Sequence, residues 1–117
     1  MRVTNAVPRH RRKKRLMKRV RGFVGGRSKL LRAAKETLVR AEAFATRDRK
    51  ARKRDFRKMW ITRINAAARA NGITYSQLIA GLAKAEIVVD RKQLSELAIH
   101  DPQAFAAVVD KAKAALA

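Results

Sequence analysis

Fourteen consecutive residues, Arg47–Trp60 (RDRKARKRDFRKMW), concentrate charged and aromatic side chains in a stretch without a helix breaker. Eight of them are Lys or Arg, opposed only by Asp48 and Asp55. At 3.6 residues per turn, these cations cover essentially all sides of a helix. Because a single groove touches one side of a helix, we predict that the stretch inserts among several polyanionic segments. Arginine outnumbers lysine there, and its planar guanidinium suits bidentate contact with phosphate.

Four aromatic residues interleave with these and other cations: Phe23, Phe44, Phe56 and Trp60. Aromatic rings beside cations can stack on unpaired bases. Phe56 and Trp60 are four residues apart, however, and this spacing equally favours packing between neighbouring turns of a helix. We favour packing for Trp60 and keep both interpretations for Phe56.

The net charge of the 117-residue chain is +21, and it is distributed unevenly. Residues 1–63 hold 24 Lys and Arg against 4 acidic residues, whereas residues 64–117 hold 6 against 5. Binding to phosphates releases their condensed counterions, which favours a nucleic acid as the partner of the basic half. A folded RNA encloses a charged helix more readily than an isolated duplex does. We therefore predict an RNA partner.

Side chains that could perform catalysis or hold a metal are sparse. The chain has no Cys, so it has no thiolate nucleophile and no disulfide. His10 and His100 lack a second ligand at helical spacing. The segment GFVGGRSK (22–29) departs from the phosphate-loop pattern, because Gly-Lys-Ser/Thr does not close it. We predict a protein that is not an enzyme and has no metal, cofactor or small-molecule substrate.

No window of the sequence approaches the apolar length of a membrane span, and no apolar run of signal-peptide length follows the basic start. We expect a soluble protein that is cytosolic or organellar and has no membrane partner. A basic membrane-active peptide would need an apolar face opposite its cations, and Arg47–Lys58 has none.

Helices are predicted throughout, so the expected class is all-α. Pro8 disfavours helix before it, and the run Arg9–Arg15 has no apolar residue to bury. We expect that run to be extended or disordered until a partner orders it. The apolar spacing from Leu16 to Phe23 then predicts a short basic helix, ended by a glycine hinge at positions 22–26.

A long helix is predicted from Ser28, a candidate N-cap, to Ala70, because no Gly or Pro interrupts a run of strong helix formers. It would span about 43 residues, or roughly 65 Å at 1.5 Å per residue. The residues that follow cannot cover such a length, so most of the helix should project from the folded part.

Three short helices are predicted beyond the C-terminal stop at Asn71-Gly72. Each begins with a capping residue: Thr74 with Gln77 as a capping box, Asp90, and Asp101 before Pro102. The strand-like run Ile87–Val89 is interpreted as a buried connector. We therefore divide the chain into a basic extension with the long helix, residues 1–60, and a small helical domain, residues 61–117.

Four segments carry a resemblance to a known family: RRKKRLMKRVRGFVGGRSK (11–29), RDRKARKRDFRKMWITRINAAAR (47–69), NGITYSQLI (71–79) and DRKQLSELAIHDPQAF (90–105). In this order and chain length, they resemble the bacterial large-subunit ribosomal protein twenty family. The resemblance implies an N-terminal extension embedded in RNA, a long kinked helix and a small C-terminal domain at the subunit surface. Thr46 departs from the family, which often has aromatic residues in the mid-helix, so no stacking role is assigned there.

The resemblance also implies a function. It implies a structural constituent of the large ribosomal subunit that binds 23S-type ribosomal RNA directly, supports subunit assembly and, in some bacteria, represses translation of its own operon. The implied partners are large-subunit ribosomal RNA, neighbouring ribosomal proteins and the chain's own messenger RNA, in the cytoplasmic ribosome. By position, the implied RNA contacts are Arg9, His10, Arg11, Arg12, Lys13, Lys14, Arg15, Lys18, Arg19, Arg21, Arg27, Ser28, Lys29, Arg32, Arg47, Arg49, Lys50, Arg52, Lys53, Arg54, Phe56, Arg57, Lys58, Arg63, Asn65 and Arg69.

A DNA-binding regulator is the alternative function. Residues 74–100 would then form a helix-turn-helix in which Arg91, Lys92 and Gln93 read base edges. The connection from Ala85 to Asp90 is longer than the usual tight turn, and most of the charge lies in the other half of the chain. These two features favour RNA as the partner.

Overall fold

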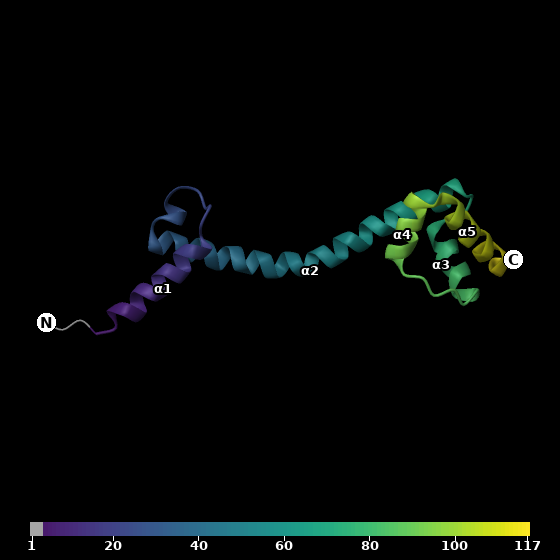
Figure 1. The fold of residues 1–117 in the computed structure, drawn as a ribbon. Helices are drawn as coiled ribbons and strands as arrows, with labels where there is room; N and C mark the ends of the chain where they lie inside the picture. The colour runs from purple at the N-terminus through teal and green to yellow at the C-terminus, as the bar shows by residue number, and fades with distance from the viewer. Residues whose placement is uncertain (1–3) are drawn as a thin grey trace. The chain divides into compact units, whose positions relative to one another are not determined.

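The computed structural model describes residues 4–117, and every regular element in that part of the chain is helical (Figure 1). In chain order the elements are α1 (Ala6–Arg19), the short 3-10 helix η1 (Gly25–Ser28), α2 (Leu31–Ala70), α3 (Tyr75–Lys84), α4 (Arg91–His100) and α5 (Pro102–Leu116). The predicted all-α class is therefore confirmed. None of these helices combines the length and apolarity needed to cross a membrane.

The chain forms two compact units, and helix α2 contributes to both. One unit extends to Lys50, and the other comprises Ala51–Ala117. The predicted division at residue 60 concerns which part folds alone, and it stays a prediction.

Helix α1 begins earlier than the sequence indicated. The expectation that Arg9–Arg15 is extended or disordered is wrong, because the run lies within α1. Pro8 occupies the first turn, where its missing N–H would have had no partner in the helix. Lys and Arg are good helix formers, and no residue of α1 is buried, so water and salt screen their repulsion. Of the segment 1–8, residues 1–3 lie outside the described part.

The predicted glycine hinge follows α1. Gly22 and Gly25 have φ angles of 90° and 66°, which side chains with a Cβ rarely adopt. On either side of the hinge, Val20 and Ala34 are fully buried, and Arg19 at the end of α1 forms an ion pair with Glu42 of α2. The end of α1 is thus tied to the first turns of α2 within the N-terminal unit.

Helix α2 contains 40 residues, close to the predicted length, but it begins at Leu31. The prediction that Ser28 caps it is wrong. Ser28 ends η1, and its hydroxyl donates a hydrogen bond to the Gly25 carbonyl oxygen at 3.2 Å. The predicted C-terminal end of this helix is confirmed, because α2 ends at Ala70 and Gly72 has a φ of 76°.

A hydrophobic core occupies the C-terminal unit, where α3, α4 and α5 gather around the last turns of α2 (Figure 1). Its buried side chains come from all four helices and the loop after α2: Ile64, Ala68, Ile73, Leu78, Leu82, Leu94, Phe105, Val109 and Ala112. Burial of this apolar surface is the main stabilising contribution to the unit. No comparable cluster is found among the described residues of the N-terminal unit.

The three predicted helix caps of this unit are confirmed. The Thr74 hydroxyl accepts a hydrogen bond from the Gln77 backbone N–H, and the Gln77 side chain accepts one from the Thr74 N–H at 3.1 Å. Asp90 accepts from the Gln93 N–H at 2.8 Å, and Asp101 accepts from the Ala104 N–H at 3.0 Å. Each cap satisfies a backbone donor that the helix leaves unpaired.

The connector between α3 and α4 is only partly buried. Ile87 and Val89 are half-buried and pack against the core, as predicted. Val88 is 98% exposed, so the prediction that the whole run is buried is wrong at this position. In an extended segment, successive side chains point to opposite sides, and only alternate ones can reach the core.

Candidate nucleic-acid interface

The side chains predicted to contact RNA lie at the surface. All the Lys and Arg residues of the predicted set are exposed, as are His10 and Phe56, whereas Ser28 and Asn65 are half-buried. No hydrophobic residue of the core is among them. The structure therefore leaves these cations accessible to a large anionic partner, and their contact with RNA stays a prediction.

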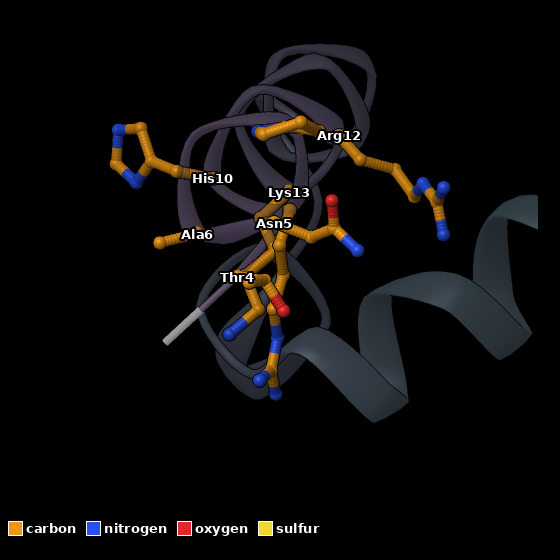
Figure 2. A pocket seen from close by; sticks show the side chains of 8 residues that line it. Thr4, Asn5, Ala6, His10, Arg12 and Lys13 are labelled. Atoms are coloured by element: carbon orange, nitrogen blue, oxygen red, sulfur yellow. The ribbon is translucent and has the colours of Figure 1, made fainter. Parts of the chain in front are cut away.

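The cations of α1 are presented on more than one side of the helix. An open surface hollow is lined by eight residues of this region: Thr4, Asn5, Ala6, Pro8, Arg9, His10, Arg12 and Lys13. Figure 2 shows His10 and Arg12 pointing to different sides of the helix. This presentation suits a partner that surrounds the helix more than one that touches a single side.

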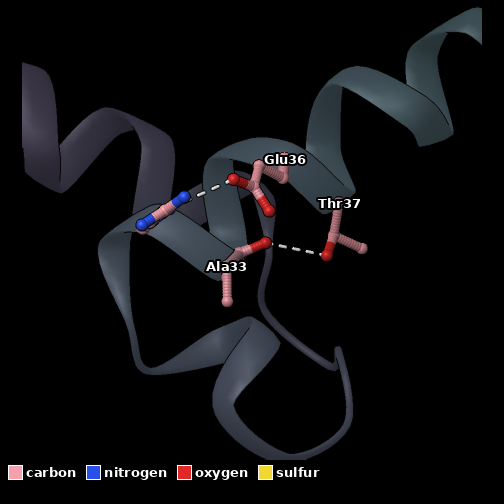
Figure 3. Close-up of polar contacts among 4 residues, drawn as sticks. Ala33, Glu36 and Thr37 are labelled. Atoms are coloured by element: carbon pink, nitrogen blue, oxygen red, sulfur yellow. Dashed lines mark hydrogen bonds and ion pairs between the residues drawn. The ribbon is translucent and has the colours of Figure 1, made fainter.

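Some of the predicted cations already have acidic partners within residues 4–117. These are the pairs Arg19–Glu42, Arg32–Glu36 and Arg47–Asp48. Figure 3 shows the carboxylate of Glu36 receiving a guanidinium hydrogen bond, which Arg32 donates at 3.3 Å. Exposed ion pairs of this kind contribute little to stability. An arginine can therefore exchange its carboxylate for a phosphate at small cost.

The start of α2 also contains a local hydroxyl bond. Figure 3 shows the Thr37 hydroxyl donating to the carbonyl oxygen of Ala33, at 2.8 Å. The bond uses the hydroxyl within the helix, so Thr37 offers little to a ligand. Three residues earlier, Ala34 is fully buried.

Cations and aromatic rings are in direct contact along α2. The Arg47 guanidinium carbon lies 4.4 Å from the centroid of the Phe44 ring, and that of Arg52 lies 5.4 Å from the Phe56 ring. The ring centroids of Phe56 and Trp60 are 6.1 Å apart with a 53° tilt. The two rings therefore pack on each other, although Phe56 is still 40% exposed and Trp60 is half-buried. Stacking of Phe56 on a base stays a prediction.

A cleft in the C-terminal unit brings together cations from two helices. Its lining residues are Lys53, Arg54, Arg57 and Trp60 of α2, with Asp90, Arg91 and Lys92 at the start of α4. Its volume is about 520 Å³. From the sequence, Arg91 and Lys92 were predicted to contact nucleic acid only in the DNA-binding alternative. The sequence did contain a signal for their role. Two cations in the first turn of a helix interact unfavourably with the helix dipole, which indicates that they serve to bind an anionic partner.

Arg91 is held in place by a neighbouring helix. Its Nε donates a hydrogen bond to the Tyr75 hydroxyl at 2.8 Å. Tyr75 itself is half-buried and packs against the core. One wall of the cleft is thus supported by the folded unit.

The remaining candidates are a metal site and a DNA-binding helix-turn-helix. Within residues 4–117, no three His, Cys, Asp or Glu side chains are grouped as metal ligands would be. Helices α3 and α4 are joined by the six-residue connector Ala85–Asp90, and neither carries the dense charge of α1 and α2. Nothing in these findings supports the DNA-binding alternative.

A sequence model of the family described as "Ribosomal protein L20" matches residues 2–108. The large ribosomal subunit protein bL20 of Cellvibrio japonicus is 55% identical over 116 residues, which cover 99% of this chain and 98% of that protein. The bL20 protein of Rhodopirellula baltica is 57% identical over 117 residues, which cover 100% and 99%. By these full-length matches, the chain belongs to the ribosomal protein L20 family, whose members are structural ribosomal proteins and not enzymes.

Proposed function

We propose that this protein of the large ribosomal subunit binds large-subunit ribosomal RNA directly through the exposed cations of α1 and α2, and that this binding supports assembly of the subunit. Its relatives are named as large ribosomal subunit proteins. The ribosome, which is cytoplasmic in bacteria, is therefore the place where the chain acts.

One observation carries the proposal. The eight cations of Arg47–Lys58 are all exposed, and in projection they cover about two thirds of the circumference of α2, while the remaining sector holds Asp48 and Asp55. Like charges at this density repel one another, and an exposed ion pair such as Arg47–Asp48 offsets little of that repulsion. Phosphates of converging RNA segments would surround the helix and neutralise these cations at once.

The exposed apolar surface of residues 64–117 has a different proposed role. Residues 64–117 are nearly neutral, and they supply most of the hydrophobic core. Exposed apolar side chains such as Val88 and Ile99 suit contact with protein more than with phosphate. We assign neighbouring ribosomal proteins to this surface as partners.

The chain's own messenger RNA is the second RNA in the proposal. The predicted set consists almost entirely of Lys and Arg, and contacts from such side chains to phosphate carry no sequence information directly. A folded segment of messenger RNA with similar geometry would therefore bind the same surface and block its translation. Translation in vitro of a reporter with the native leader should fall as the protein is added, and unchanged translation would remove this part of the proposal.

The salt dependence of RNA binding tests the main proposal. Affinity for a large-subunit ribosomal RNA fragment should fall steeply with salt, by roughly 0.7 to 0.9 in log affinity per unit of log salt for each phosphate neutralised. Removing residues 1–27 should flatten the dependence yet leave some binding by α2 and the C-terminal unit. The Lys111→Ala change in α5 removes an exposed cation outside the predicted set, and it should leave the salt dependence nearly unchanged. A slope near zero for the full chain would contradict the proposal.

A further inference from the structure

The Trp60 cleft, lined by Lys53, Arg54, Arg57, Trp60, Asp90, Arg91 and Lys92, differs in chemistry from the rest of the basic surface. It places five cations and one carboxylate around an indole ring, in a hollow of about 520 Å³. The hollow on α1, in contrast, is lined by cations without a Phe, Tyr or Trp ring. A hollow with an aromatic lining can hold a compact, flat ligand.

Core packing does not account for the position of Trp60. The core of the unit and the partly buried hydrophobic residues packed on it come from other positions. Trp60 is half-buried, and its aromatic neighbour is Phe56, which does not line the cleft. The indole is therefore steadied by a ring outside the cleft while part of it stays exposed inside.

The α4 wall of the cleft is held in place before any ligand arrives. Arg91 is held by its hydrogen bond to the Tyr75 hydroxyl, and Asp90 uses its carboxylate to cap α4 through the Gln93 N–H. Asp90, the only acid in the cleft, is therefore already hydrogen-bonded to the backbone of α4. The start of α4 also contributes the positive end of a helix dipole. These features favour a ligand with both a flat ring and a negative charge.

We propose that the Trp60 cleft binds one unstacked nucleotide of an RNA strand. Its base stacks on the indole of Trp60, and its phosphates contact Arg91 and Lys92 on one wall and Lys53, Arg54 and Arg57 on the other. The inference rests on the proposed RNA-binding function and deepens it, because it assigns a base contact to a surface otherwise proposed to contact phosphate. Stacking of bases on aromatic side chains accepts any base, so the site reads the presence of an unpaired base and not its identity.

Intrinsic fluorescence of the full-length chain tests the proposal, because Trp60 is its only tryptophan. Short oligoadenylate should quench this fluorescence as it binds, since a stacked base contacts the indole directly. Inorganic polyphosphate of matched charge is the comparison probe, because it binds the same cations but offers no base. Polyphosphate should bind with little quenching. Equal quenching by the two probes at saturation, or none by oligoadenylate that demonstrably binds, would overturn the inference.

Substitutions separate stacking from folding. Trp60→Leu should weaken oligoadenylate binding about tenfold, which corresponds to about 1.4 kcal/mol and lies within the range for base stacking on an aromatic side chain. Its affinity for polyphosphate should not change. Phe44→Leu is the matched control, because it removes another partly exposed aromatic ring that contacts an arginine, outside the cleft. Wild-type affinity of Trp60→Leu for oligoadenylate would overturn the inference.

A second pair of variants keeps the test decisive if Trp60→Leu fails to fold. Lys92→Gln removes an exposed cation of the cleft wall and leaves the indole in place, so it should reduce quenching at a given oligoadenylate concentration several-fold. Lys84→Gln, which removes an exposed cation outside the cleft, should have a smaller effect. Equal effects of the two changes would show that only overall charge matters and would overturn the inference.

Binding of the wild-type chain to ribosomal RNA distinguishes the two proposals. Steep salt dependence without quenching of Trp60 would leave RNA binding intact and remove the nucleotide site. Failure to bind ribosomal RNA at all would remove the proposed function as well. An acidic peptide that quenches or shields Trp60 more strongly than oligoadenylate would assign the cleft to a protein partner and overturn the inference.

Discussion

Gly81 of α3 lies against the backbone of Ala112 of α5. A Cβ placed at position 81 would be 2.5 Å from the Ala112 carbonyl oxygen and 2.9 Å from the Ala112 Cβ. These separations are shorter than real Cβ contacts, and the obstacle is helix backbone, which cannot rotate aside. The two helices therefore approach each other closely because residue 81 has no side chain.

Gly81→Ala should destabilise the C-terminal unit by about 1 to 3 kcal/mol, as overpacking of a core does. The effect opposes helix propensity, which alone would favour Ala over Gly by about 1 kcal/mol. Chemical unfolding of the variant and the wild type measures the change in the free energy of unfolding. Gly26→Ala is the matched control, because its Cβ would meet only the Leu30 side chain, at 3.2 Å, and that side chain can move. An unchanged free energy of unfolding for Gly81→Ala would contradict the packing of α3 on α5.

Arg52→Ala and Arg54→Ala should both weaken binding to ribosomal RNA. The two positions are about 160° apart in projection on a helix, and both side chains are exposed. If RNA surrounds this part of α2, each change removes a charge-assisted contact of about 1.5 to 3 kcal/mol. Binding assays at constant salt measure the loss. A large loss at one position with none at the other would indicate that RNA contacts only one side of the helix.

Leu94→Ala should separate folding from binding. Leu94 is almost fully buried in the core, and its truncation should lower the free energy of unfolding of the C-terminal unit by about 2 to 5 kcal/mol. It removes no cation, so RNA affinity should fall less than stability does. Thermal melting and RNA binding of the same variant give the two values. Complete loss of RNA binding, with wild-type binding by Arg52→Ala and Arg54→Ala, would place recognition in the C-terminal unit.

In the free protein, amide hydrogens of exposed segments should exchange faster than those near the buried core. No residue of α1 is buried and residues 41–50 of α2 are all exposed, so their amides should exchange through local opening at low free energy. Amides near Ile64 and Leu78 should exchange only when the C-terminal unit unfolds. Addition of ribosomal RNA should protect α1. Uniform protection from Leu31 to Ala70 without RNA would contradict both this expectation and the predicted independence of residues 61–117.

Features that depend on neighbouring residues were predictable from the sequence. Thr74, Asp90 and Asp101 each cap the helix expected of them, because a cap needs only its own side chain and a backbone N–H a few residues away. The end of α2 before Gly72 follows from the same local logic. Ser28 was not predictable in this way, because its hydroxyl can either cap a following helix or bond within a 3-10 turn. In the structure it bonds to the Gly25 carbonyl oxygen within η1.

The sequence by itself determined the helical class, the concentration of cations in residues 1–63 and the exposure of those cations, because charge and helix propensity are properties of each residue and its near neighbours. Only the tertiary structure decided that Gly81 meets the Ala112 backbone, that Val88 is exposed between two half-buried neighbours, and that Arg91 and Lys92 join Trp60 in one cleft. Each of these relationships depends on how helices distant in sequence pack together, and local periodicity carries no information about that packing.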